Sequence, residues 1–150
     1  MWSVPKKAKI VFILLVAALL LIQVFEVERT NPPVQAEISV EPDIRPLLHN
    51  ACYNCHSNVT QWPWYSHVAP ASWLVVSDVD EGRRHLNFSE WGTHNAKTQY
   101  RKMEEVAQEV IEKAMPPWYY KAMHKKARLT AAERGQIWAW AVTESEKLVQ

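Results

Sequence analysis

The residues of this chain that can do the most specific chemistry stand together at Cys52-Tyr53-Asn54-Cys55-His56. Two thiols three positions apart on one helical turn can each add to a vinyl group of the same porphyrin. The adjacent histidine is then delivered to the iron from one face. This C-x-x-C-H pattern predicts covalent attachment of one c-type haem, with Cys52 and Cys55 as thioether anchors and His56 as an iron ligand.

Other interpretations of the same residues are weaker. A thioredoxin-like C-x-x-C needs a surrounding βαβ pattern of apolar strands, and the sequence shows none. A closed zinc site could take Cys52, Cys55 and His56, but it requires a fourth ligand and usually a second paired motif. A disulfide across two intervening residues closes too small a loop to stabilise much. These are the only two cysteines of the chain, so no further thiol needs an explanation.

Met115 is the first candidate for the second iron ligand. It stands directly before Pro116-Pro117, and the double proline would fix an extended loop that can hold a thioether over a porphyrin face. A sulfur ligand opposite a histidine favours ferrous iron and raises the reduction potential. Methionine at a helix end is also a common core filler. His124 is the second candidate for the ligand, and the other histidines considered are His49, His67, His85 and His94.

The N-terminus predicts a membrane anchor. Three lysines in residues 6–9 precede an apolar run from Ile10 to Phe25 that only Gln23 interrupts. The run spans about 24 Å as a helix, and a snorkelling lysine narrows the gap to the roughly 30 Å hydrocarbon core. The basic flank predicts that the N-terminus stays inside and the rest is exported. A cleaved signal peptide is the alternative, but its candidate site at residues 34–36 lies far beyond the apolar run.

Three segments follow from these features: an anchor at residues 1–27, a polar, proline-bearing stalk at 28–40, and one cytochrome c-like haem-binding domain at 41–150. The predicted location is a membrane crossed once, with the domain on the exported side. The formal net charge of +1 gives no indication of a nucleic-acid partner.

The exported domain is predicted to be all-α, because its periodic segments all show helical spacing. Asp43 is expected to cap a first helix that runs through Ile44 into the cysteine motif. A second helix should cover Ala71 to about Arg84, fraying at Gly82. A third should begin at Thr93 or Asn95 and end at the double proline, and a last one should open on the capping box at 130–133.

Each of the two C-terminal helices is expected to have one apolar face. In the third helix, Lys102 falls on the charged side. The apolar face of that helix is formed by Tyr100, Met103, Ala107, Val110, Ile111 and Ala114, and the last helix directs Ile137, Trp138, Ala141, Val142 and Leu148 toward a core.

The chain resembles a known family in several runs taken together. Residues 52–91 resemble the small bacterial haem-binding domain family of membrane-anchored, cytochrome c-like proteins, and the C-x-x-C-H, late Met-Pro and capped last helix look like a class I cytochrome c. The resemblance implies haem binding, and together with the anchor it implies a bacterial inner membrane crossed once, with the domain in the periplasm. The usual glycine-aromatic pair of the first helix is missing, and Gly135 with Trp138 could replace it at the helix crossing. The matching runs are Cys-Tyr-Asn-Cys-His-Ser-Asn at 52–58, Trp-Pro-Trp-Tyr-Ser at 62–66, Ala-Pro-Ala-Ser-Trp at 69–73, Glu-Gly-Arg at 81–83 and Leu-Asn-Phe-Ser-Glu-Trp at 86–91.

Further residues near the motif have weaker assignments. A carbonyl near Pro63 could accept the second ring N–H of His56. Residues 81–83 could form a turn, with Arg83 or Arg84 reaching a haem propionate. Two further groups of residues each have a functional and a plain structural interpretation. An aromatic wall around the haem, or simple core packing, could be formed by Trp62, Trp64, Tyr65 and Trp73. A docking strip for a redox partner, or an ordinary solvated surface, could be formed by Lys113, Lys121, Lys125, Lys126 and Arg128.

The functional expectation is therefore a membrane-anchored monohaem c-type cytochrome that transfers one electron to or from a redox protein partner and is not an enzyme. Two alternatives stay open at this stage. One is a small haem peroxidase with an open sixth site and His124 as proton shuttle. The other is a haem-based sensor whose iron ligand is exchanged when a gas binds.

Overall fold

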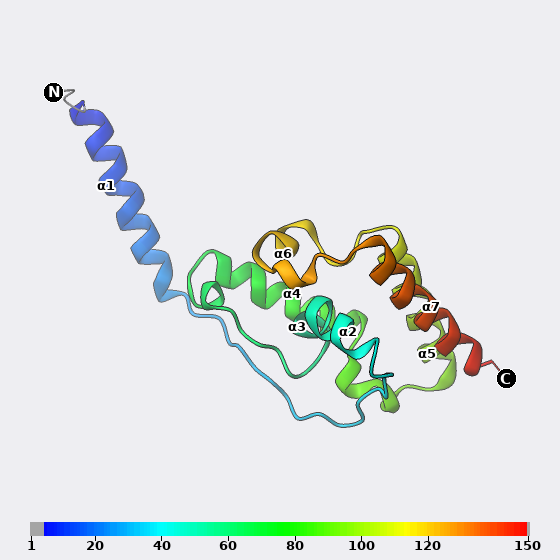
Figure 1. The fold of residues 1–150 in the computed structure, drawn as a ribbon. Coiled ribbons are helices and arrows are strands. Elements are labelled where there is room, and N and C mark those ends of the chain that lie inside the picture. Colours follow the sequence, from blue (N-terminus) through cyan, green and yellow to red (C-terminus); the bar gives the residue numbers. More distant parts are fainter. Residues whose placement is uncertain (1–4, 150) are drawn as a thin grey trace. The chain divides into compact units, whose positions relative to one another are not determined.

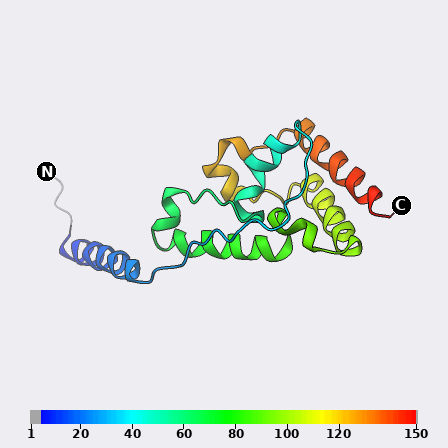
Figure 2. The same ribbon diagram turned by 90° about the horizontal axis from the view of Figure 1, so that it is seen from below.

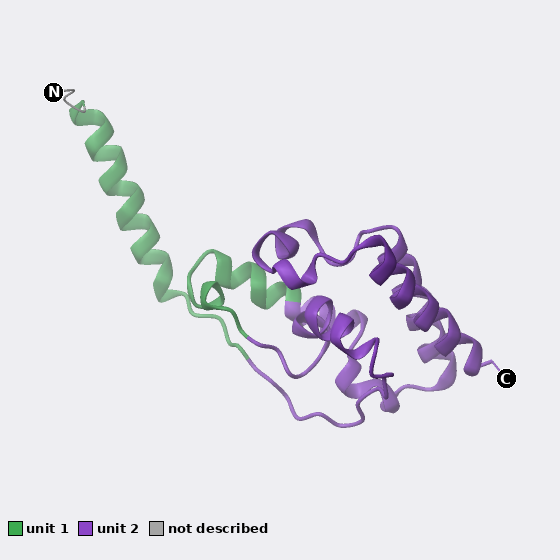
Figure 3. Cartoon of the chain, viewed as in Figure 1, with its two compact units in different colours: residues 1–29, 62–78 green, residues 30–61, 79–150 purple. Residues whose placement is uncertain are grey.

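The structure, a computed structural model, describes residues 5–149. These residues form seven α-helices and four short 3-10 helices without a β-strand, which confirms the all-α fold class (Figure 1). The chain divides into unit 1, residues 1–29 and 62–78, and unit 2, residues 30–61 and 79–150 (Figure 3). Residues 1–4 of the predicted anchor and residue 150 of the predicted domain lie outside the described residues.

Unit 1 begins with the apolar N-terminal helix. The helix α1, Lys6–Leu21, continues into the 3-10 helix η1, Ile22–Val24. Together they form 19 residues with a mean hydropathy of 2.3, none of them buried, and this is long and apolar enough to cross a membrane. The 3-10 helix η2, Trp64–His67, and the first half of α4 complete this unit.

The helix α4, Ala71–His85, begins at the predicted residue and ends one residue later than predicted. Gly82 lies inside it, so the predicted fraying at this residue and the predicted turn at 81–83 are wrong. Arg83, Arg84 and His85 form its last turn, where positive charge complements the carbonyl end of the helix. The division between the two units falls within this helix, after Asp78.

The cysteine motif of unit 2 lies on two short helices, α2, Arg45–Ala51, and α3, Tyr53–His56, where one helix was predicted. Cys52 separates them with φ −124° and ψ −40°. The predicted cap at Asp43 is also wrong, since the N-cap residue is Ile44 and its side chain makes no capping bond. A turn replaces the cap: the amides of Ile44 and Arg45 both donate to the carbonyl of Glu41, at 3.2 and 3.0 Å.

The C-terminal half of unit 2 contains η3, Phe88–Thr93, α5, Ala96–Ile111, α6, Trp118–Met123, η4, Lys125–Ala127, and α7, Ala131–Lys147. Asn95 caps α5, as predicted, by accepting from the amide of Thr98 at 2.9 Å. The capping box of Thr130 and Glu133 is confirmed. The third predicted helix is too long, because α5 ends before the prolines and Lys113 takes a left-handed φ of 65°.

Helices α5 and α7 pack against each other and provide most of the helical core of unit 2 (Figure 1, Figure 2). Met103, Ala107 and Val110 are buried as predicted, but Ile111 is 50% exposed and Lys102 is buried. Trp138 is 43% exposed, and Trp140 occupies the core instead. Helix α2 contacts α7, but no atom lies within 4 Å of a side chain added at Gly135, so this residue does not make their crossing possible.

The last residues of the predicted stalk take part in the core of unit 2. The amide of Ile38 donates to the carbonyl of Phe88 at 3.0 Å, and the amide of Ala36 donates to that of Ser89 at 3.1 Å. The side chains of Ile38 and Val40 are buried in the same core cluster as Phe88. The exact limits of the stalk stay a prediction.

Candidate functional site

The backbone holds the two cysteines and the histidine of the motif in a compact turn. The amide of Cys52 donates to the carbonyl of Leu48 at 2.8 Å, and the carbonyl of Cys52 accepts from the amides of Cys55 and His56 at 3.1 and 2.9 Å. Both cysteines are present as thiols. Cys52 packs against the hydrophobic core, so the turn is attached to the interior of unit 2 on one side.

The imidazole of His56 is oriented by two backbone carbonyls. Its Nδ1 lies 2.9 Å from the carbonyl oxygen of Gly82 and 3.1 Å from that of Leu86. Because both partners are acceptors, Nδ1 carries the proton and Nε2 carries the lone pair. Burial lowers the pKa of His56, which favours the neutral ring that binds a metal. The predicted acceptor near Pro63 is wrong: the carbonyls come from the end of α4 and the residue that follows it.

Gly82 allows α4 to approach the motif closely. A Cβ atom at this position would lie 2.5 Å from the carbonyl oxygen of Cys55 and 3.1 Å from its Cβ. Real side chains do not approach a backbone oxygen this closely, so only glycine fits. The same close approach brings the Gly82 carbonyl within hydrogen-bond distance of His56.

The thiol of Cys52 stays protonated at neutral pH. Desolvation by burial is the main cause that raises the pKa of Cys52 to about 12, and the charge of Cys55 adds to this rise. The positive charge of Arg134 has a smaller, opposing effect. A redox-active C-x-x-C motif depends on a lowered cysteine pKa. The electrostatics therefore argue against the thioredoxin-like interpretation.

Both backbone groups of Met115 are bound. Its amide donates to the carbonyl of Glu109 at 3.1 Å, and its carbonyl accepts from Nη1 of Arg134 at 2.8 Å. Arg134 is buried and also donates to the carbonyl of Val110 at 3.0 Å. The side chain of Met115 is 36% exposed, so the methionine is not a core filler. Sequence reasoning missed Arg134, although a charged residue one turn before Ile137 on a core-facing helix was the available signal.

Cys52, Cys55 and His56 are brought together directly in one turn of the backbone, whereas Met115 lies on a separate loop. Arg134 holds the carbonyl of Met115, and its positive charge opposes the rise in the pKa of Cys52 to a small extent.

An orphaned donor gives a test of whether a haem fits these residues. The indole Nε1 of Trp140 is buried and has no hydrogen-bond partner among the described residues. Leaving such a donor unsatisfied costs about 1–3 kcal/mol. Trp140 lies in the same core cluster against which Cys52 packs, and the carboxylate of a haem propionate is an acceptor that would satisfy it. The thiols and the oriented imidazole are of the types that can hold a haem, and this donor suits a propionate.

The other histidines considered as ligands have different surroundings. His124 stacks on Tyr120 with ring centroids 4.1 Å apart, and burial lowers the pKa of His124. Tyr120 in turn accepts a hydrogen bond from Nδ2 of Asn54 at 2.9 Å, so α6 is attached to the cysteine motif. His49 stacks on Tyr53 at 3.9 Å.

Arg83 stabilises the chain after His56. It donates to the carbonyl of Ser57 at 2.8 Å, to Oγ1 of Thr60 at 2.9 Å and to Oδ1 of Asn31 at 3.2 Å. These three bonds use Nε and Nη2 of the guanidinium and give Arg83 a structural role, while a propionate contact of Arg83 or Arg84 stays a prediction. Trp64, predicted to pack in a core or around a haem, is 74% exposed in unit 1.

Comparison with known proteins agrees with this chemistry. The chain matches a family model described as a haem-binding domain over residues 17–143, which include the cysteine motif and Met115. No curated protein and no solved structure matches the chain. Since the match covers far more than half of the sequence, the chain belongs to the haem-binding domain family.

Proposed function

We propose that this chain is a membrane-anchored, monohaem c-type cytochrome that carries one electron at a time in the bacterial periplasm. The observation that carries the proposal is the arrangement of His56. Its Nδ1 is committed to the carbonyls of Gly82 and Leu86, which leaves the lone pair of Nε2 for a metal, directly beside two thiols at the spacing of a haem attachment site. Membership of the haem-binding family supports the cofactor.

Cys52 and Cys55 would hold the haem covalently. Each thiol adds its sulfur to one carbon of a vinyl group and its hydrogen to the other, so the addition needs no oxidant. Nε2 of His56 would bind the iron, and the bonds at Nδ1 would fix the ring and raise its basicity. The sulfur of Met115 would be the second protein ligand of the iron. When bound, the haem supplies an iron that alternates between ferric and ferrous states by one electron.

Two protein ligands leave the iron without an open position for a substrate, so the proposed activity is electron transfer and not an enzymatic reaction. The partner is then another redox protein. The exposed side chains of Lys113, Lys125, Lys126 and Arg128 favour a partner with an acidic docking surface. Electron-transfer rates to such a partner should fall with increasing ionic strength.

The anchor in this proposal is the apolar helix Lys6–Val24. Its 19 residues extend about 28 Å, close to the roughly 30 Å thickness of the hydrocarbon core. Lys6, Lys7 and Lys9 lie at its N-terminal end, which favours the cytoplasmic side for this end and the periplasm for the residues that follow.

The test is expression of the full chain in a bacterial host competent for cytochrome maturation. The expected product is red, its mass exceeds that of the polypeptide by one haem, and the added mass is lost in the double variant Cys52→Ala, Cys55→Ala. Colourless protein without added mass would overturn the proposal.

The spectrum separates the rival functions. A low-spin ferric spectrum with a sulfur-to-iron charge-transfer band, abolished in Met115→Ala and retained in Met123→Ala, supports an electron carrier. Met123 is a suitable control because its side chain is 57% exposed. A high-spin ferric spectrum would indicate a peroxidase, and rapid carbon monoxide binding to the reduced protein would indicate a sensor.

A further inference from the structure

The segment 62–78 of unit 1 has the composition of a membrane interface. It contains three of the eight tryptophans of the chain and no lysine or arginine, and its titratable groups are Tyr65, His67 and Asp78. Its large apolar side chains are widely exposed: Trp64 by 74%, Leu74 by 52%, Val68 by 45% and Trp73 by 38%. Several large apolar side chains exposed within one short segment point to an interaction site.

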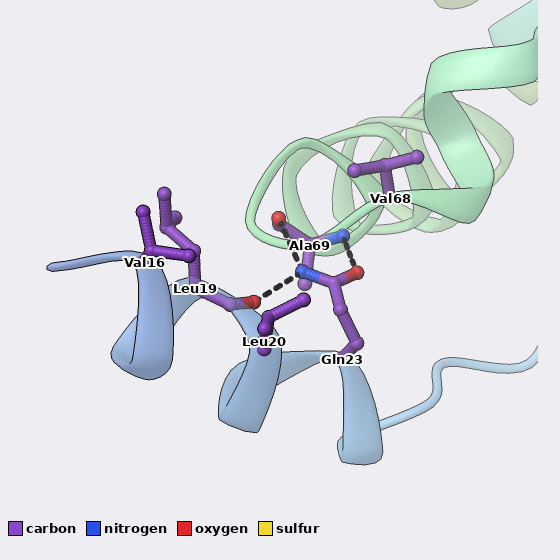
Figure 4. Close-up of a pocket in the computed structure, with 6 residues that line it drawn as sticks. All are labelled: Val16, Leu19, Leu20, Gln23, Val68 and Ala69. Carbon is purple, nitrogen blue, oxygen red and sulfur yellow. Dashed lines mark hydrogen bonds between the residues drawn. The ribbon is translucent and has the colours of Figure 1, made fainter. Parts of the chain in front are cut away.

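Hydrogen bonds attach this segment to the end of the apolar helix. Nε2 of Gln23 donates to the carbonyls of Ala69 at 3.0 Å and Leu19 at 2.8 Å, and Oε1 of Gln23 accepts from the amide of Ala69 at 2.9 Å (Figure 4). Nε1 of Trp73 donates to the carbonyl of Phe25 at 3.2 Å. The one polar side chain of the apolar run therefore pairs with segment 62–78.

A groove of about 530 Å³ lies where the segment meets the helix. Apart from the amide of Gln23, its walls are apolar. The lining residues are Val16, Leu19, Leu20, Gln23, Val68 and Ala69 (Figure 4).

A second, polar hollow of about 230 Å³ shares two residues of this lining, Gln23 and Ala69. It is also lined by Glu26, Arg29, His67 and Ser72. The surface thus changes from apolar to polar across Gln23 and Ala69, in the same order in which a phospholipid changes from acyl chain to headgroup.

The position of the groove along the helix identifies its occupant. If Lys6–Val24 crosses the bilayer, as the proposed function requires, Val16, Leu19 and Leu20 lie in the outer half of the hydrocarbon core and Val24 at its edge. Segment 62–78, bound to Gln23 and Phe25, then lies at the level of the headgroups. Tryptophan is enriched at this depth, because its ring is apolar and its N–H is polar.

We propose that segment 62–78 is an interfacial collar: it lies in the outer surface of the bilayer that α1 crosses, and the groove beside Gln23 holds a phospholipid of that leaflet. The collar thus supplies, from a distant part of the sequence, the aromatic belt that residues next to a membrane helix usually provide. This inference rests on the proposed membrane anchoring and extends it to a second surface.

The test measures depth with a nitroxide on the full chain in vesicles of phosphatidylethanolamine and phosphatidylglycerol. Trp64, Val68, Leu15 and Trp118 are each replaced, one at a time, by p-acetylphenylalanine, which is coupled to a hydroxylamine nitroxide so that the cysteines are not modified. Collision with oxygen, which concentrates in lipid, is compared with collision with a water-soluble nickel chelate. Trp118 of unit 2 is the matched control for Trp64, since its side chain is 77% exposed. Circular dichroism verifies that each labelled chain is folded.

The expected ratio of oxygen to nickel collisions is several-fold higher for labels at positions 64 and 68 than at 118. Equal ratios at 64 and 118, with position 15 still in lipid, would overturn the collar and leave the anchor intact. A label at position 15 that meets the nickel chelate would overturn the anchor itself. Labels at 64 and 68 that are shielded from both reagents would also overturn the collar, because protein would then cover this surface.

Discussion

The guanidinium of Arg134 donates to the carbonyl of Met115 at 2.8 Å and to that of Val110 at 3.0 Å. One buried side chain of α7 thus joins the end of α5 to the loop that contains the candidate iron ligand. The positions of these two backbone carbonyls depend on a residue about twenty positions further along the chain.

Replacement of this arginine should loosen the Met115 loop. Arg134→Met leaves the Met115 carbonyl without this donor, whereas the Val110 carbonyl keeps the amide of Lys113 at 3.2 Å, and we expect the free energy of unfolding to fall by roughly 1–3 kcal/mol. The sulfur-to-iron charge-transfer band should weaken, and cyanide should bind the ferric protein several-fold faster. Urea titration and stopped-flow absorbance measure these effects.

The exposed pair of Arg101 and Glu105 provides the control, because Arg101→Met should change stability by only about 0.5 kcal/mol or less. An unchanged band in Arg134→Met would contradict the role of this residue.

Gly82 and Gly135 should respond to alanine in opposite directions. Gly82→Ala places a methyl group 2.5 Å from the carbonyl oxygen of Cys55, and the resulting displacement should cost about 1–3 kcal/mol of stability. Gly135 lies within α7 with nothing within 4 Å of an added methyl group, so Gly135→Ala should stabilise by about 0.5–1 kcal/mol. Urea unfolding of both variants gives the comparison. Equal effects would mean that α4 does not approach the motif as described.

Trp140→Phe should affect stability differently in the protein with and without haem. In the haem-free double cysteine variant, the removal of an unsatisfied buried donor offsets part of the cost of the smaller side chain, so stability should fall by less than in the haem-containing protein. In the haem-containing protein it should remove a bond to a propionate, and the reduction potential and the stability should both change. Trp138→Phe is the control, because Trp138 is 43% exposed. Identical behaviour of Trp140→Phe in the two forms would rule out the propionate contact.

The capping box of α7 should make stability depend on pH in the acid range. Hydrogen bonds from the backbone and side chain of Thr130 lower the pKa of Glu133. A carboxyl whose pKa is lower in the folded state stabilises the fold above its unfolded pKa of roughly 4.3, and this contribution is lost as the pH falls through the folded value. Glu133→Gln keeps an acceptor at this position and removes only the charge.

Urea unfolding between neutral and strongly acid pH measures this effect. The wild type should be more stable than Glu133→Gln at neutral pH, and the two should converge in acid. A difference that stays constant with pH would contradict the pKa shift. Thr130→Ala, which removes the cap itself, should cost about 1 kcal/mol at neutral pH.

Local patterns in the sequence were sufficient to predict several features of the structure. The apolar helix, the start of α4 at Ala71, the cap at Asn95 and the capping box at Thr130 were all predicted, because each depends on residues within one or two turns of each other. The chemistry of the C-x-x-C-H motif is local for the same reason, because its two cysteines and its histidine share one turn.

Only the tertiary structure decided which distant groups meet these local elements. The acceptors of His56 lie 26 and 30 residues away, and helical periodicity does not reveal which carbonyls will face a ring. Periodicity placed Lys102 in solvent, but its ammonium donates to the carbonyl of His85 at the end of α4, which allows it to be buried. Helical periodicity also predicted Trp138 as the core residue of α7, where the structure buries Trp140. The reason is that packing against α5 sets the orientation of α7 about its axis. Spacing along the chain determines which groups share a turn. The close approach of backbones from different helices determines that the carbonyls of Gly82 and Leu86 and the side chain of Arg134 complete the site.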